Sequence, residues 1–119
     1  MSAIVVIESD KLMRELLVEW LSAAGYSVRT PAPADVKAST NAALVIVDVY
    51  MPRREGLQRL RAVKAAIPET PVIAISGQFR PGLTGLSTAA DALGVHQVIA
   101  KPFSRRDLLT AVDSVIGPA

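Results

Sequence analysis

The sequence predicts an α/β domain with a doubly wound, five-stranded parallel sheet and helices on both of its faces. Short apolar runs rich in β-branched residues alternate with segments of helical periodicity along the whole chain. This alternation is typical of parallel sheets. The apolar runs are nearly continuous rather than alternating, as in strands that helices cover on both sides. At 119 residues the chain suffices for one such domain and is too short for two, so we expect residues 1–119 to form a single domain.

The first strand and helix have the clearest patterns. Residues 3–8 (Ala-Ile-Val-Val-Ile-Glu) form the apolar run of a strand buried on both faces. Apolar residues then recur every three or four positions, as on one face of a helix that ends at Gly25. These residues are Met13, Leu16, Leu17, Trp20 and Leu21. We expect Trp20 to lie in the core, and residues 26–30 to form a second, weaker strand.

The middle of the chain continues the alternation. Residues 32–41 are short and poorly patterned, and Pro33 near their start suits the first turn of a helix. Residues 43–48 (Ala-Leu-Val-Ile-Val-Asp) form a third strand, again buried and again ending in a carboxylate. Residues 55–67 have helical apolar spacing and stop before Pro68.

The last third of the chain supplies two more strands and two helices. Residues 71–76 and 95–100 are predicted strands. Between them, a glycine-punctuated loop at 77–85 precedes a short helix at about 86–93. Residues 104–116 form the final helix, and Ser104 with an acidic residue three positions later is typical of an N-terminal cap.

Composition excludes several classes of protein. The chain has no cysteine, so disulfides and cysteine-bound metals are excluded. No signal peptide is apparent, and the apolar runs fall short of the ~20 residues that span a bilayer, so we expect a cytoplasmic protein without a membrane segment. A net charge of +2 and 4% aromatic residues do not favour binding to nucleic acid. We expect the exposed pair Arg105 and Arg106 to suit an acidic partner protein instead.

Polar side chains follow the predicted strands, at the sheet edge where doubly wound folds gather functional groups. They are Glu8, Ser9 and Asp10 after the first strand, Asp48 after the third, Ser76 after the fourth and Lys101 after the fifth. Each has a structural alternative: Ser9 or Asp10 could cap the first helix, and Asp48 could form a turn. The single histidine, His96, is predicted at the opposite end of the sheet.

Together these residue types suit phosphoryl transfer to a carboxylate. A carboxylate pair holds Mg²⁺, and the metal reduces repulsion between an anionic phosphoryl donor and an attacking aspartate. A lysine neutralises further charge, and a small hydroxyl group hydrogen-bonds a phosphoryl oxygen. Aspartate is an established covalent acceptor of phosphate.

Four motifs resemble the receiver domain of two-component response regulators. They are Ile-Glu-Ser-Asp at 7–10, Val-Asp-Val-Tyr-Met-Pro at 47–52 followed by Gly56, Ile-Ser-Gly at 75–77 and Ala-Lys-Pro-Phe at 100–103. The motifs occur in the family's order, and the resemblance covers the whole chain. It implies a flavodoxin-like (βα)5 fold with strand order 2-1-3-4-5. It also implies a non-enzymatic signalling switch that receives its phosphoryl group from a histidine kinase or histidine phosphotransfer protein.

The resemblance implies a role for each site residue. Asp48 would be the phosphoryl acceptor, Lys101 its charge partner, and Ser76 the hydroxyl that couples phosphorylation to loop movement. Mg²⁺ would be bound by Glu8, Asp48 and the backbone carbonyl of Tyr50, with Ser9 or Asp10 as a further ligand. With no effector segment after Ala119, we expect output through contact with another protein.

Three features depart from the family pattern. Ser9 stands where the family has a second acidic residue, Val98 stands where it often has a switch aromatic, and the loop at 77–85 is longer than usual. Of these departures, Ser9 and Val98 favour the alternative of a degenerate receiver that binds partners without phosphorylation. An α/β enzyme acting on a small phosphorylated substrate would use the same carboxylates, but so short a chain lacks room for a cap domain.

Overall fold

The fold is a five-stranded parallel sheet with strand order β2-β1-β3-β4-β5, as predicted. The computed structural model describes residues 3–8, 10–30, 42–48, 54–76, 94–101 and 103–117. The strands are β1 (Ala3–Ile7), β2 (Ser27–Arg29), β3 (Leu44–Asp48), β4 (Val72–Ser76) and β5 (Gln97–Ala100). All four neighbouring pairs are parallel.

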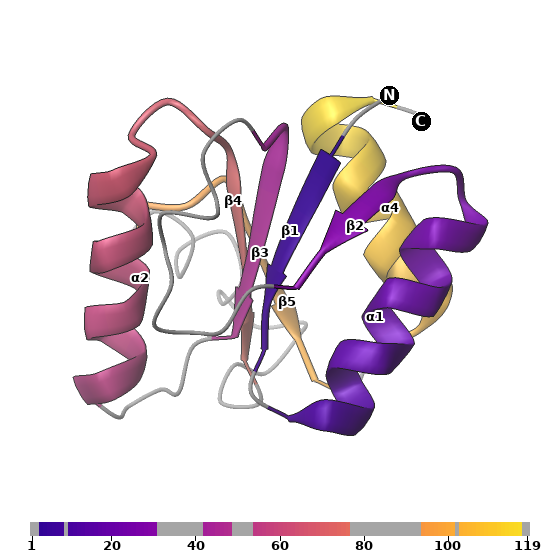
Figure 1. Ribbon diagram of the computed structural model, residues 1–119, viewed down its shortest axis with the longest axis horizontal. Coiled ribbons are helices and arrows are strands. Elements are labelled where there is room, and N and C mark those ends of the chain that lie inside the picture. The colour runs from indigo at the N-terminus through magenta and orange to yellow at the C-terminus, as the bar shows by residue number, and fades with distance from the viewer. Residues whose placement is uncertain are drawn as a thin grey trace.

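Three described helices flank the sheet. The helices α1 (Lys11–Ala23) and α4 (Arg105–Ile116) cover one face, and α2 (Arg54–Ala66) covers the other (Figure 1). The helices predicted at 32–41 and 86–93, and the predicted loop at 77–85, lie outside the described residues. Within the part of the chain that the structure describes, no helix has the length and apolar character needed to cross a membrane.

The register of the strands aligns their carboxyl ends. Ile7 of β1 pairs with Val47 of β3, and Ser76 of β4 pairs with Ala100 of β5. The residues that follow these positions, or stand beside them, therefore meet at one edge of the sheet. This alignment places Glu8, Asp48 and Lys101 on a common edge, because each stands at or just after the end of its strand.

The core consists of two apolar layers, one on each face of the sheet. Ile4 and Val6 of β1 point toward α1 and α4, whereas Val5 and Ile7 point to the other layer, which includes Leu60 of α2. These β1 side chains are fully buried. Burial of each such side chain contributes roughly 1.5–3 kcal/mol to the stability of the fold. Both faces of the sheet therefore contribute to the packing of its helices, as the continuous apolar runs predicted.

Local hydrogen bonds set the helix ends. The α1 helix ends in a Schellman motif, in which Tyr26 N donates to Leu21 O and Gly25 N donates to Ser22 O. Gly25 has a φ of 101°, a conformation that glycine adopts without steric cost. The predicted cap of α4 is a capping box, in which Ser104 and Asp107 each accept a bond from the other's backbone N–H.

Trp20 differs from its prediction. It is half-buried rather than fully enclosed, and it packs against the layer beneath α1 and α4. Its ring meets Phe103 in a T-shaped contact, with centroids 6.2 Å apart and planes at 72°. The apolar stripe of α1 is correct, but fully buried positions are filled by Leu17 and Leu21. The large indole is therefore packed against this layer from outside its fully buried part.

Candidate functional site

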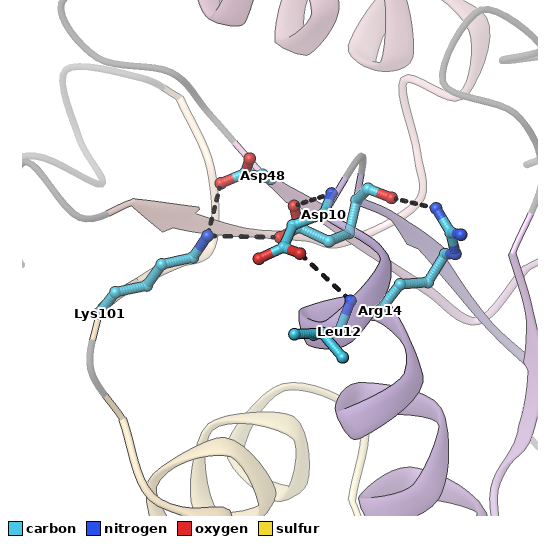
Figure 2. Close-up of polar contacts among 6 residues, drawn as sticks. Asp10, Leu12, Arg14, Asp48 and Lys101 are labelled. Atoms are coloured by element: carbon cyan, nitrogen blue, oxygen red, sulfur yellow. Dashed lines mark hydrogen bonds and ion pairs between the residues drawn. The ribbon is translucent and has the colours of Figure 1, made fainter.

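Three charged side chains from three strand ends converge at the carboxyl edge of the sheet. Figure 2 shows Lys101 extending toward Asp48, with dashed lines from its ammonium group. The Lys101 Nζ atom lies 3.4 Å from Asp48 Oδ1 and 3.5 Å from Glu8 Oε2. One ammonium group therefore bridges two carboxylates that come from β3 and from the end of β1.

The two carboxylates are buried and the lysine is partly exposed. The exposed fractions of the side chains are 1% for Glu8, 5% for Asp48 and 26% for Lys101. Buried carboxylates are rarely left uncompensated, because the desolvation of an unpaired charge is costly. Lys101 supplies the positive charge that compensates both carboxylates here. Because Lys101 is partly exposed, the site is open to solvent on the side of this residue.

Two hydrogen bonds, one from a backbone N–H and one from an arginine side chain, hold Glu8 in place. Asp10 N donates to Glu8 Oε1 at 3.0 Å, and Arg14 Nη1 donates to the Glu8 carbonyl oxygen at 3.0 Å. A carboxylate fixed by a main-chain donor keeps one orientation, so the remaining oxygen, Oε2, is the one that faces Lys101.

Asp10 serves as the N-cap of α1. Its Oδ1 accepts a bond from Leu12 N at 3.2 Å, and the residue is exposed. The capping role left open between Ser9 and Asp10 therefore belongs to Asp10. Figure 2 shows its carboxylate directed at the first turn of α1, where the dashed line to Leu12 marks the cap.

Burial and neighbouring charges shift the pKa values of Glu8 and Lys101. Burial raises the pKa of Glu8, and the nearby charge of Asp48 raises it further, against the opposing effects of Asp10 N and Lys101. Burial alone would lower the pKa of Lys101, but the charges of Glu8 and Asp48 outweigh burial and raise it. When all three groups are ionised the cluster carries a net negative charge, which favours a further cation.

The other predicted site residues are described only in part or not at all. Ser76 ends β4 and pairs through its backbone with Ala100, but its side chain lies outside the described residues. Ser9 and Tyr50 also lie outside them. His96 is exposed, and its Nδ1 accepts a bond from Val72 N at 3.4 Å, at the opposite edge of the sheet from Lys101.

Arg14 is a site residue that sequence reasoning missed. Its guanidinium bonds the Glu8 carbonyl at the point where the chain leaves β1. The signal was present in the sequence, because Arg14 stands four positions after the N-cap Asp10. Side chains on a helix lean toward its N-terminus, so an arginine at that spacing reaches back to the strand end.

The donor set fits a magnesium ion. Mg²⁺ prefers one or two protein carboxylates and keeps several water molecules, and Glu8 with Asp48 supply two carboxylates within reach of one ammonium group. Among the described residues no group of three or more acidic, histidine or cysteine side chains gathers. Ligands beyond these two carboxylates would have to come from backbone oxygen, from water or from residues not described.

Comparison with known proteins agrees with this geometry. Residues 4–113 match the family model of the response regulator receiver domain. The regulatory protein VirG of Agrobacterium tumefaciens is 33% identical over 113 residues, which cover 92% of this chain and 41% of VirG. Protein CcdB of Bacillus subtilis is 30% identical over 122 residues, covering 98% of this chain and 99% of CcdB. The chain thus spans less than half of VirG.

Solved structures share the fold. The chemotaxis protein CheY4 of Vibrio cholerae superimposes with a TM-score of 0.77 at 23% identity, covering 97% of this chain and 98% of CheY4. NtrX of Brucella abortus gives a TM-score of 0.78 at 27% identity, covering 97% of this chain and 27% of NtrX.

Proposed function

The chain belongs to the response regulator receiver domain family, and from that membership we propose that it is a phosphorylation switch. In this proposal Asp48 accepts a phosphoryl group from a histidine kinase or a histidine phosphotransfer protein in the cytoplasm. The observation that carries the proposal is the pairing of one ammonium group, that of Lys101, with the buried carboxylates of Glu8 and Asp48. Receiver domains are signalling proteins rather than known enzymes, so we propose no substrate turnover beyond this transfer.

The transfer forms one bond and breaks one bond. A carboxylate oxygen of Asp48 attacks phosphorus, and the bond between phosphorus and the donor's imidazole nitrogen breaks, leaving its electron pair on that nitrogen. The incoming phosphoryl group is anionic and so is Asp48. Lys101 lies 3.4 Å from Asp48, close enough to offset part of the charge that gathers there.

Mg²⁺ would be held by Glu8, Asp48 and the carbonyl of Tyr50, with Ser9 or Asp10 as a further ligand, and would supply the remaining charge neutralisation between the two anions. Asp10 already bonds Leu12 N, and a serine adds no negative charge. We therefore expect weaker metal binding than a second carboxylate at position 9 would give.

A substitution at position 9 measures this effect. Ser9→Asp adds a carboxylate beside Glu8, and we expect it to tighten Mg²⁺ binding by at least about tenfold, because Mg²⁺ favours anionic oxygen ligands. Isothermal titration calorimetry compares the two proteins directly. Equal affinities would show that position 9 does not contribute to the metal site.

We propose that Lys101 and Ser76 transmit the phosphorylation of Asp48 to a surface that a partner protein recognises. The backbone of Ser76 pairs with Ala100, the neighbour of Lys101, which supports a path from the site to the adjoining strand. We propose that the Ser76 hydroxyl bonds the phosphoryl group and that the segment after it moves. Since Val98 replaces the usual aromatic, that segment is the proposed moving element, and the output partner is a protein that distinguishes its two states.

A phosphorylation assay tests the proposal. The protein is incubated with Mg²⁺ and a small phosphoryl donor such as phosphoramidate, and intact mass spectrometry follows the product. We expect one added phosphoryl group, lost in Asp48→Asn and retained in the matched control Asp113→Asn on the exposed surface of α4. If the wild type gains no phosphoryl group, the proposal fails in favour of a degenerate receiver that binds partners without phosphorylation.

A further inference from the structure

Arg14 bonds the link between β1 and α1 at two points. Its backbone N donates to Asp10 O at 2.9 Å, and its Nη1 donates to Glu8 O at 3.0 Å. The first bond is the usual one from a helix to the carbonyl of its N-cap residue. The second is different, because it joins a helix side chain to the end of the preceding strand. Arg14 therefore holds the residues on both sides of position 9.

The Glu8 carbonyl takes its donor from a side chain. The pairing of β1 with β3 ends at Ile7 and Val47, so Glu8 lies one residue beyond the ladder. A guanidinium donor makes a charge-assisted hydrogen bond, which is roughly twice as strong as a neutral one. Arg14 is half-buried, so less water competes for this bond than at an exposed position. The bond therefore fixes the peptide group of Glu8.

The same arrangement fixes the Glu8 carboxylate. Its Oε1 accepts a bond from Asp10 N at 3.0 Å, and its Oε2 lies 3.5 Å from Lys101 Nζ. Because Arg14 bonds the main chain of both Glu8 and Asp10, it holds the carboxylate's donor as well as the residue that carries the carboxylate. A shift of this link would move Glu8 Oε2 relative to Asp48, the other carboxylate of the site.

Arg14 acts on the site through Glu8 rather than by touching the carboxylates. In the part of the chain that the structure describes, Arg14 forms no ion pair. Figure 2 shows Arg14 and Lys101 approaching from opposite sides, and the dashed line from Arg14 ends on a carbonyl oxygen. Its influence on the site must therefore pass through the position of Glu8.

We propose that Arg14 is a positioning residue for the metal site, and that its bond to the Glu8 carbonyl holds the Glu8 carboxylate where it can share Mg²⁺ with Asp48. The inference rests on the proposed function, which assigns Mg²⁺ to these two carboxylates. Position 9 is a serine and adds no charge, so Mg²⁺ binding depends on the placement of few anionic ligands. Removing a group that orients a metal ligand typically lowers metal affinity by roughly 10–100-fold.

Positioning and simple electrostatics predict opposite effects when the guanidinium is removed. Arg14 is a cation near a site for a cation. By Coulomb's law alone, its loss should leave Mg²⁺ binding unchanged or make it tighter. The loss of a positioning bond should instead weaken Mg²⁺ binding, because Glu8 is then free to take other orientations. The direction of the change therefore separates the two roles.

Isothermal titration calorimetry with MgCl₂ alone measures this change. We expect Arg14→Met to weaken Mg²⁺ binding by about tenfold, as for other groups that orient metal ligands. Arg14→Lys keeps a donor on a flexible stem and should bind Mg²⁺ within about threefold of the wild type. The matched control is Arg61→Met, which removes an exposed arginine from the middle of α2 and should leave the affinity unaltered.

A second measurement follows the same bonds without metal. The amide of Asp10 donates to Glu8 Oε1, and its hydrogen exchange, measured by NMR, reports whether that bond persists. Arg14→Met should speed exchange at Asp10 by at least about fivefold, because the link is then free to open locally. The amide of Val6, a fully buried residue of β1, should exchange as in the wild type. Arg14→Lys should restore the protection of Asp10.

Three results would overturn the inference. They are Mg²⁺ binding by Arg14→Met that equals or exceeds that of the wild type, equal acceleration of exchange at Asp10 and Val6, and failure of Arg14→Lys to restore either quantity. Equal acceleration would mean that Arg14 supports the stability of the whole domain rather than the placement of Glu8.

These results are distinct from failure of the proposed function. A wild type that is phosphorylated on Asp48 and binds Mg²⁺, while Arg14→Met binds Mg²⁺ equally well, would refute the role of Arg14 alone. A wild type that binds no Mg²⁺ would refute both the metal site and the positioning role.

Discussion

The charged residues at the sheet edge and those on α4 differ in their burial. At the sheet edge, the side chains of Glu8 and Asp48 are only 1% and 5% exposed, whereas Arg105 and Asp113 on α4 face solvent. Buried charges interact strongly because little water screens them, and exposed charges are weakened by water and salt. The buried cluster should therefore influence the stability of the free protein, and the α4 charges should matter mainly when a partner excludes water.

The largest expected effect comes from removing the shared cation. Lys101→Met keeps the aliphatic stem but removes the ammonium group that the two buried carboxylates share. Losing one partner of a fully buried pair costs 3–5 kcal/mol, and the partial exposure of Lys101 reduces the expected loss to about 2 kcal/mol. Urea denaturation measures it.

The matched control for this prediction is Lys11→Met, which removes an exposed lysine and should change stability by less than about 0.5 kcal/mol. If both variants unfold at the same urea concentration, the ion pairs of Lys101 do not contribute to the free energy of unfolding as predicted.

Removing one of the two carboxylates should have the opposite sign. Asp48→Asn keeps the shape of the side chain and leaves Glu8 and Lys101 as a balanced pair. Repulsion between the two carboxylates, which helps to raise the pKa of Glu8 after burial, disappears. We expect the free energy of unfolding to rise by about 1 kcal/mol, a common gain where a functional site carries strain. A loss of that size would instead mean that Asp48 serves the turn after β3.

The fold was predictable from the sequence because its determinants are local. Continuous apolar runs mark strands covered on both faces, and Ser104 with Asp107 marks the start of α4. The strand ends then determine the site. Once the sheet is parallel, Glu8, Asp48 and Lys101 must share an edge, whatever their rotamers.

The features that the sequence did not predict depend on packing between elements. The half-exposure of Trp20 reflects how α1 sits beside Phe103, and the bond from Arg14 to Glu8 depends on one rotamer. Likewise, the charge of Asp113 helps to raise the pKa of Tyr26. The two residues are 87 positions apart in the sequence, so no local sequence pattern could predict that they interact.

Tyr26 allows a pH test of the region around α4. Its hydroxyl donates to Gly117 O at 2.9 Å, and burial, followed by the charge of Asp113, raises its pKa above the ordinary value of 10.0. The folded state thus retains the phenol proton more strongly than the unfolded chain. The resulting stability is fully present below pH 10 and declines as the pH rises through the higher pKa of the folded state.

Tyr26→Phe should reveal this contribution. It removes the hydrogen bond, at a cost of about 1 kcal/mol near neutral pH, and it removes the alkaline decline. Lys101, whose pKa is also raised, titrates in the same range, so the informative quantity is the difference between the two proteins. That difference should shrink above pH 10, and a constant difference would show that Tyr26 does not titrate as described.

The smallest expected effect concerns the exposed arginine itself. Arg105→Glu replaces a cation by an anion in the first turn of α4, where the helix dipole favours negative charge. The free energy of unfolding should rise by roughly 0.5 kcal/mol at low ionic strength and return to the wild-type value in high salt, because the group is exposed and screened. Arg61→Glu in the middle of α2 makes the same charge change away from a helix end and should leave stability unaltered. A loss of stability in Arg105→Glu that persists in high salt would mean that the arginine packs within the monomer, and the contrast between buried and exposed charge would then fail at this position.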